Sequence, residues 1–174
     1  ALPAMLLYVW APIVGRSSLE RFDREALRLL STGRRRDLGP LYFRALAMRL
    51  FAPPSLVQER RGLVAAETDR PAEAVSAYSE ALAGYEEGAV PLGVRLGLAH
   101  ACYALGRDAD AIRHYEAALA FGGALPRVIA NLAHALVRSG GDVERDVDLA
   151  VRARGDGVSA ESADLLLVQA LGEA

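Results

Sequence analysis

The chain has 174 residues, a net charge of −2 at pH 7, 52% hydrophobic residues and 24% charged residues, a balance that excludes disorder and predicts a folded core. The small net charge excludes a global field directed at nucleic acid or at an acidic membrane surface, and the single cysteine, Cys102, excludes an internal disulfide. Lysine is absent, so all 20 Lys/Arg residues are arginine, which is typical of a GC-rich bacterial genome.

Residues 1–16 form an apolar N-terminal segment, and its first fifteen residues carry no charge. Tyr8 and Trp10 followed by Arg16 are typical of the water-facing end of a membrane helix. The alternative is a terminal helix packed on the following domain, and Pro12 argues against an uninterrupted helix. Both interpretations stay open. Seven arginines from Arg16 to Arg36 favour a cytoplasmic domain, tethered to the inner face of a bacterial membrane under the first interpretation.

Residues 17–174 are expected to form short helices separated by Gly and Pro. Ser17-x-x-Glu20 and Ser55-x-x-Gln58 have the spacing of capping boxes and predict two helix starts. The expected helices cover residues 17–31, 41–51, 55 onward, 71 onward, 91–106, 108–122, 125–139, 143–152 and 159 onward. No segment alternates apolar and polar residues with the two-residue period of a strand. We therefore predict an all-α fold in which neighbouring helices are antiparallel.

A helical unit recurs along the chain. The stretch "DRPAEAVSAYSEALA" (69–83) returns as "GRDADAIRHYEAALA" (106–120), and seven aligned positions are identical. The tetrapeptide "LAHA" occurs at 98–101 and again at 132–135. These spacings of 37 and 34 residues predict helix pairs that stack as structural repeats.

The repeated unit resembles a tetratricopeptide repeat. The positions that carry the resemblance are Gly62, Ala74, Tyr78 and Ala81-Leu82 in one unit, Leu98-Ala99, Gly106, Ala111, Tyr115 and Ala118-Leu119 in the next, and Leu132-Ala133, Leu136 and Gly140 in the third. The match is best over residues 55–140, with about three to four repeats in all, the first of them degenerate. The resemblance implies a right-handed superhelical stack, an α-solenoid, that binds a protein or peptide in its concave groove.

The same resemblance implies which side chains line that groove. They are Glu59, Arg60, Leu63, Leu96, His100, Tyr103, Arg127, Asn131, His134 and Arg138. In superhelical members of the family, an asparagine at the place of Asn131 holds the backbone of a bound peptide, and an amide suits this because it donates and accepts. The arginines favour a partner that bears carboxylates or is acidic.

We find no constellation for catalysis. His100 and His134 are expected about 10 Å apart, the separation of packed helices, which is too far for a shared metal ion. Cys102 falls where the repeat needs a small core residue. "GRRRD" (33–37) lacks the interleaved aromatics of a nucleic-acid site. The sequence therefore predicts a scaffold for protein–protein interaction, with no enzyme activity, metal or cofactor. The alternative is a regulatory or targeting extension of a larger membrane-embedded enzyme whose catalytic part is not in this chain.

Overall fold

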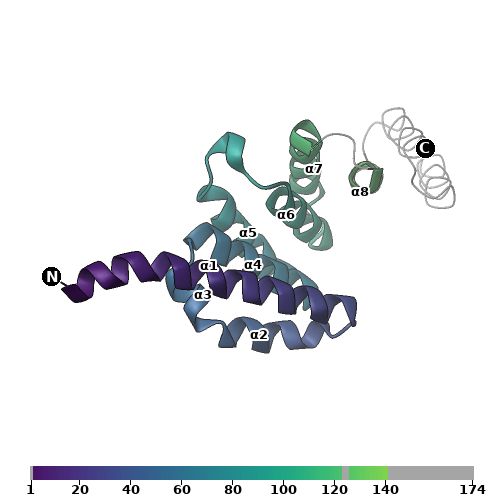
Figure 1. Cartoon of the computed structure of the whole chain (residues 1–174). Helices are drawn as coiled ribbons and strands as arrows, with labels where there is room; N and C mark the ends of the chain where they lie inside the picture. The colour runs from purple at the N-terminus through teal and green to yellow at the C-terminus, as the bar shows by residue number, and fades with distance from the viewer. Residues whose placement is uncertain (1, 123–125, 141–174) are drawn as a thin grey trace. The chain divides into compact units, whose positions relative to one another are not determined.

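The computed structural model describes residues 2–122 and 126–140, which belong to two compact units, residues 1–90 and 91–174 (Figure 1). Every regular element in these described ranges is a helix. The predicted all-α fold is therefore confirmed. The helices expected at 143–152 and from 159 onward lie outside the described residues.

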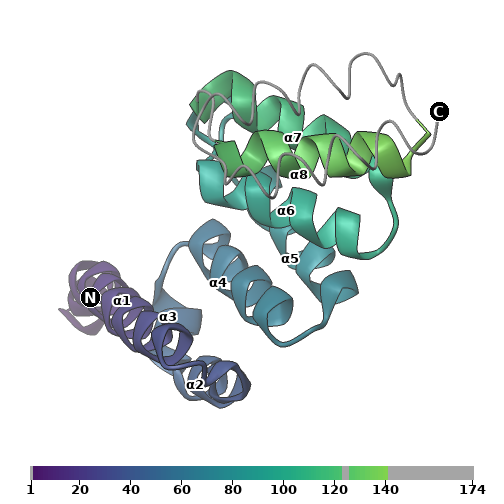
Figure 2. The same ribbon diagram turned by 90° about the vertical axis from the view of Figure 1, so that its right-hand side faces the viewer.

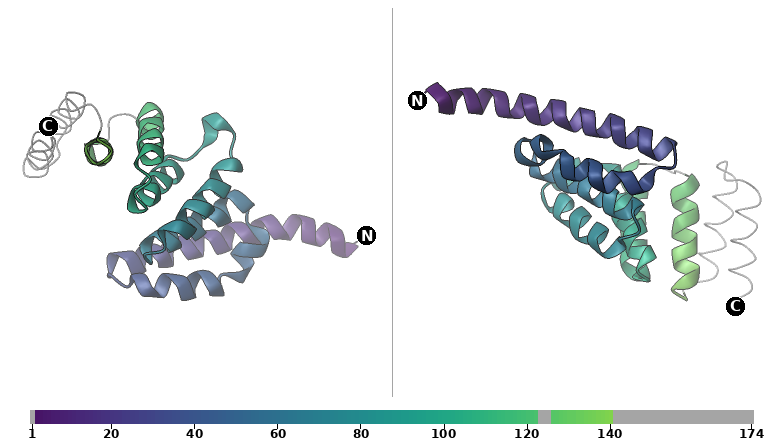
Figure 3. Two further views of the ribbon diagram at one scale, coloured as in Figure 1. Left: turned by 180° about the vertical axis from the view of Figure 1, so that it is seen from behind. Right: turned by 90° about the horizontal axis from the view of Figure 1, so that it is seen from below.

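The first unit contains five α-helices. They are α1 (Leu2–Ser31), α2 (Leu38–Arg44), α3 (Leu46–Phe51), α4 (Pro54–Glu67) and α5 (Pro71–Ala83), with 3₁₀ turns at Arg35–Asp37 and Glu87–Ala89. α1 packs against α2 and α3, and α4 pairs with α5. The first half of α1 extends past the other helices of this unit (Figure 3). Phe22, Leu38 and Met48 are fully buried and form the centre of the core beneath α1.

α1 is one continuous helix, so the predicted start at Ser17 and the predicted interruption at Pro12 are wrong. The Ser17 hydroxyl donates to the Ile13 carbonyl over 2.9 Å, a bond that serine makes inside a helix rather than at its start. Glu20 pairs with Arg16 one turn earlier. Pro12 removes one backbone donor, but the helix continues because the face that follows it is buried in the core.

The predicted helix over residues 41–51 is divided into α2 and α3 at Ala45, whose φ of −76° and ψ of 50° leave the helical region. This break turns α3 across α1. At the crossing, a Cβ added to Gly15 would lie 2.3 Å from the carbonyl oxygen of Phe51, so only glycine allows the two backbones this close. α4 then begins at Pro54, so Ser55 lies inside the helix rather than capping it.

The α4–α5 pair is joined by a small residue packed against an aromatic ring. A Cβ on Gly62 would lie 2.8 Å from the ring of Tyr78, so the absent side chain makes room for the ring. Ala74, Tyr78 and Ala81 are buried along α5. Burial also raises the pKa of the Tyr78 hydroxyl. The small positions of the repeat therefore set how closely its two helices approach.

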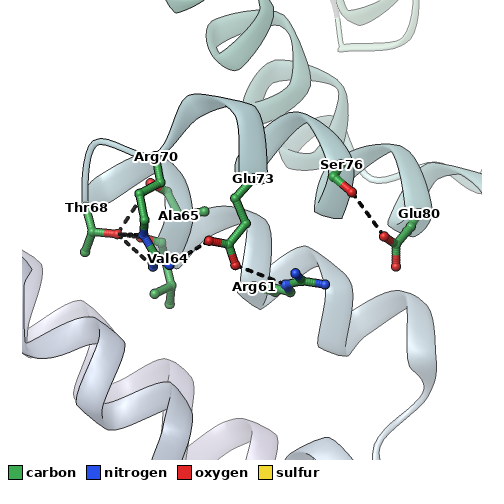
Figure 4. Close-up of polar contacts among 8 residues, drawn as sticks. All are labelled: Arg61, Val64, Ala65, Thr68, Arg70, Glu73, Ser76 and Glu80. Carbon is green, nitrogen blue, oxygen red and sulfur yellow. Dashed lines mark hydrogen bonds and ion pairs between the residues drawn. The ribbon is translucent and has the colours of Figure 1, made fainter.

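A polar network ties the α4–α5 turn together (Figure 4). The Glu73 carboxylate accepts from Arg70 over 2.6 Å and from Arg61 over 3.2 Å. The Thr68 hydroxyl donates to the Val64 carbonyl over 2.6 Å. The pairing of Arg61 with Glu73 gives the charge of Arg61 a partner at this half-exposed position.

The second unit contains three described helices, α6 (Leu92–Ala104), α7 (Asp108–Gly122) and α8 (Pro126–Arg138), and α7 packs against both others (Figure 2). Ala111, Tyr115 and Ala118 are buried along α7, like their counterparts on α5. Because α7 begins at Asp108, this residue lies in the first turn of the helix.

The turn after the first helix of each pair is the same in both units. Asp69, Gly106 and Gly140 have positive φ angles of 59°, 70° and 68°, and they stand 37 and 34 residues apart. In the first two turns the next amide, of Arg70 and of Arg107, returns to a carbonyl five residues earlier over 2.9 Å. This is the Schellman ending of a helix, repeated in register with the sequence.

Among the helices that the structure describes, none has a stretch both long and apolar enough to cross a lipid bilayer.

Candidate functional site

The predicted groove residues of the second unit lie on two neighbouring helices. We call this surface the α6–α8 face; it consists of Leu96, His100, Tyr103, Asn131, His134 and Arg138. All six side chains are partly or fully exposed. The opposite sides of the two helices are buried, through residues such as Leu98 on α6 and Leu132 on α8. Helical periodicity therefore turns the polar residues of both helices to one surface.

Asn131 and His100 connect the two helices at the middle of this face. The amide nitrogen of Asn131 lies 2.7 Å from Nε2 of His100. An amide nitrogen only donates, so this contact requires the tautomer of His100 in which Nε2 accepts. The His100 ring also meets Tyr115 edge-on, at 5.5 Å between ring centres. The carbonyl of Asn131 remains suited to accept a hydrogen bond from a ligand.

Arg138 closes one end of the face. Its Nε donates to both carboxylate oxygens of Asp108, over 2.9 and 3.0 Å, and its Nη2 donates to Asp108 and to the carbonyl of Tyr103. Its guanidinium also stacks on the Tyr103 ring, 3.6 Å from the centroid. The hydrogen bond to Asp108 raises the pKa of Arg138. The side chain therefore fixes the end of α8 to the α6–α7 turn while 41% of it stays exposed.

The remaining predicted residues of this unit are less defined by contacts. His134 is half-buried, and this burial lowers the pKa of its imidazole, so the neutral ring is favoured. Leu96 is also half-buried and supplies apolar surface. The backbone of Arg127 lies in the first turn of α8, and its side chain lies outside the described part of the chain.

The three predicted groove residues of the first unit, Glu59, Arg60 and Leu63, lie on α4, where two of them pair within the protein. Arg60 donates to both carboxylate oxygens of Asp23 on α1, over 3.0 and 2.8 Å, and this bond raises the pKa of its guanidinium. Glu59 pairs with Arg60 and accepts from the Tyr85 hydroxyl over 3.1 Å. These contacts join α1, α4 and the segment after α5.

Sequence reasoning missed three of these partners: Asp23, Tyr85 and Asp108. Asp23 and Arg60 are 37 residues apart, and Asp108 and Arg138 are 30 apart. No local spacing reveals such pairs, because they depend on which helices pack together. The repeat period gives one usable signal. Residues about one repeat apart lie on neighbouring repeats, so an acidic and a basic residue at that distance are candidates for an ion pair.

The Cys102 thiol and the acidic side chains of the described residues do not form a second kind of site. Cys102 is 1% exposed, and burial raises the pKa of its thiol, which disfavours the reactive thiolate. Within residues 2–122 and 126–140, no three His, Cys, Asp or Glu side chains come close enough to hold a metal ion.

No protein-family model matches the chain, and no curated protein matches it. The fold and the α6–α8 face are therefore the features that bear on its function.

Proposed function

We propose that the chain is a protein-interaction module of the tetratricopeptide type, a right-handed solenoid that binds an extended peptide segment on the α6–α8 face. Support comes from the recurring turn at Asp69, Gly106 and Gly140, from the packing of Gly62 against Tyr78, and from the burial of Tyr115 at the equivalent place on α7. A stack of such pairs buries its core between neighbouring helices and leaves a long surface free, which suits binding.

The observation that carries the proposal is the polar α6–α8 face itself. Asn131 can accept from a peptide N–H through its carbonyl, as a bridging amide does. The Tyr103 ring and Leu96 add apolar contact for a ligand side chain. Arg138 still attracts a carboxylate, but Asp108 neutralises part of its charge. We therefore expect recognition of a peptide backbone and an apolar side chain first, and an acidic group second.

The test is a selection of peptides from a random library against the immobilised full chain, followed by affinity measurements on the selected peptides. Asn131→Ala is expected to weaken binding by about 1–3 kcal/mol. This is the usual cost of removing one partner of a hydrogen bond so that the other partner stays buried without one. The matched control is Arg113→Ala on α7, whose side chain is 69% exposed. If Asn131→Ala and Tyr103→Ala both bind selected peptides as the wild type does, the α6–α8 face is not the binding surface.

A further inference from the structure

Exposed apolar side chains are concentrated in helices α1 to α3 of the first unit. Eight of the nine large apolar side chains that the structure shows exposed lie within residues 10–51, and the ninth is Leu105. Trp10 is 57% exposed on α1, and Leu50 is 63% exposed on α3. Such a concentration marks an interaction surface rather than ordinary scatter.

α1 and α3 touch where Gly15 meets Phe51, so exposed apolar side chains of both helices lie near one crossing. A groove of 710 Å³ lies beside this crossing. Pro12 and Leu19 of α1 and Leu50 and Phe51 of α3 line it, together with the Arg16–Glu20 ion pair. We call the exposed apolar and basic residues of these helices and of α2 the α1–α3 face; its members are Trp10, Ile13, Val14, Leu46, Leu50, Phe51, Arg21, Arg24 and Arg44.

The same exposed stripe of α1 changes from apolar to basic along its length. Trp10 and Val14 are followed, at steps of three or four residues, by Ser17, Arg21 and Arg24, and all five are exposed. Residues at these steps share one side of a helix. The helix therefore presents apolar side chains first and guanidinium groups next, on one side.

The basic part of this face contains arginines whose charge no carboxylate of the described residues neutralises. A second groove, of 640 Å³, is lined by Arg21, Arg24 and Arg28 of α1 and Arg44 of α2. Among the residues that the structure describes, no carboxylate pairs with Arg21, Arg24 or Arg44, whereas Arg28 pairs with Glu25. Residues 1–53 contain nine arginines and four acidic residues, a net charge of +5, so the rest of the chain carries −7.

We propose that the α1–α3 face docks on the surface of an anionic lipid bilayer. Apolar side chains that enter the headgroup layer, with arginines beside them to meet lipid phosphates, are the two components of interfacial membrane binding. A second copy that packed through this same face would bring the same positive charge onto it, which disfavours a symmetric dimer. Nucleic acid would use the arginines but gain little from Ile13, Val14 and Leu50. The proposal is independent of peptide binding, because the α1–α3 and α6–α8 faces share no residue.

Trp10 is the only tryptophan of the chain, so its fluorescence reports directly on this face. The full chain is titrated with vesicles of phosphatidylcholine alone and with vesicles of phosphatidylcholine and phosphatidylserine in equal amounts. The expected result is a blue shift of Trp10 emission and co-sedimentation with the anionic vesicles, both reduced by added salt. Absence of both effects with anionic vesicles overturns the proposal, and so does equal affinity for the two kinds of vesicle.

Variants then separate the two components. Arg21→Gln and Arg24→Gln are each expected to weaken vesicle binding about fivefold, and Leu50→Ser about tenfold. Arg113→Gln and Leu105→Ser are the matched controls, because both residues are exposed in the second unit, and they are expected to leave binding unchanged. Circular dichroism verifies that each variant is folded.

Two further outcomes would overturn the proposal. A double variant of Arg21 and Arg24 that keeps wild-type vesicle affinity would show that the arginines do not meet lipid. A blue shift that grows with protein concentration in the absence of vesicles would show that a second copy covers the face.

Discussion

Replacing Gly15 by alanine tests the crossing of α1 and α3. The new Cβ would lie 2.3 Å from the Phe51 carbonyl oxygen and 2.5 Å from its carbon, and both are backbone atoms that no rotamer change can move. Ordinary contact begins near 3.4 Å, so the two helices must separate locally by about 1 Å. Separation of this kind in a packed core costs about 1–3 kcal/mol.

Alanine also favours the helix by about 1 kcal/mol relative to glycine, which offsets part of this cost. Because the obstruction is backbone, we expect the upper part of the range and a net loss of about 1–2 kcal/mol in the free energy of unfolding. The matched control is Gly39→Ala in α2, where the new Cβ meets no atom within 4 Å apart from its chain neighbours and the backbone of its own helix. Gly39→Ala should be neutral or slightly stabilising.

The assay is urea unfolding followed by circular dichroism, with hydrogen exchange of the α3 amides as the local measurement. The Ala52 amide, which donates to Met48 over 2.9 Å, should exchange faster in Gly15→Ala than in the control. Equal unfolding free energies for the two variants, with unchanged protection in α3, would refute the close contact of α1 and α3.

Three more predictions concern the turns, the Arg138 contact and pH. Asp69→Gly should stabilise the chain by about 1 kcal/mol, because glycine adopts φ of 59° without strain; urea unfolding checks this, and Gly106→Ala should act in the opposite direction. Arg138→Ala should lower the free energy of unfolding by about 1–2 kcal/mol, a range reduced for solvent screening, and should therefore lower the melting temperature. A melting temperature unchanged within error would show that Arg138 does not have this structural role. His134 has a lowered pKa in the folded state, so below pH 6.5 the unfolded chain binds a proton that the folded chain does not. Stability should therefore fall as pH drops from 6.5 towards the folded pKa, and less so in His134→Gln; parallel pH profiles for the two proteins would contradict this.

Elements with local punctuation could be predicted closely from the sequence. Pro71 begins α5 and Pro126 begins α8, because proline suits the first turn of a helix and ends whatever precedes it. The repeat period also located the turns at Gly106 and Gly140. In these cases the residues that determine the structure are neighbours in the sequence.

Elements decided by packing could not be predicted. A capping pattern at Ser17 and a proline at position 12 both favoured a break, yet the buried face of α1 continues through this region and keeps the helix intact. No residue pattern near Ala45 predicts the helix break there. The break goes with the packing of α3 across α1 at Gly15, which involves residues far apart in the sequence. The candidate site shows the same limit: its residues could be named from the repeat, but not their partners Asp108 and Asp23.

The recurring turn also shows where the chain can change in length. The spacing from Asp69 to Gly106 exceeds that from Gly106 to Gly140 by three residues, and the excess falls between the end of α5 and the start of α6. Residues 84–91 therefore contain the length difference, whereas the turns themselves have the same geometry. In protein engineering, residues 86–90 are accordingly the place to add sequence, since Tyr85 before them is held by Glu59.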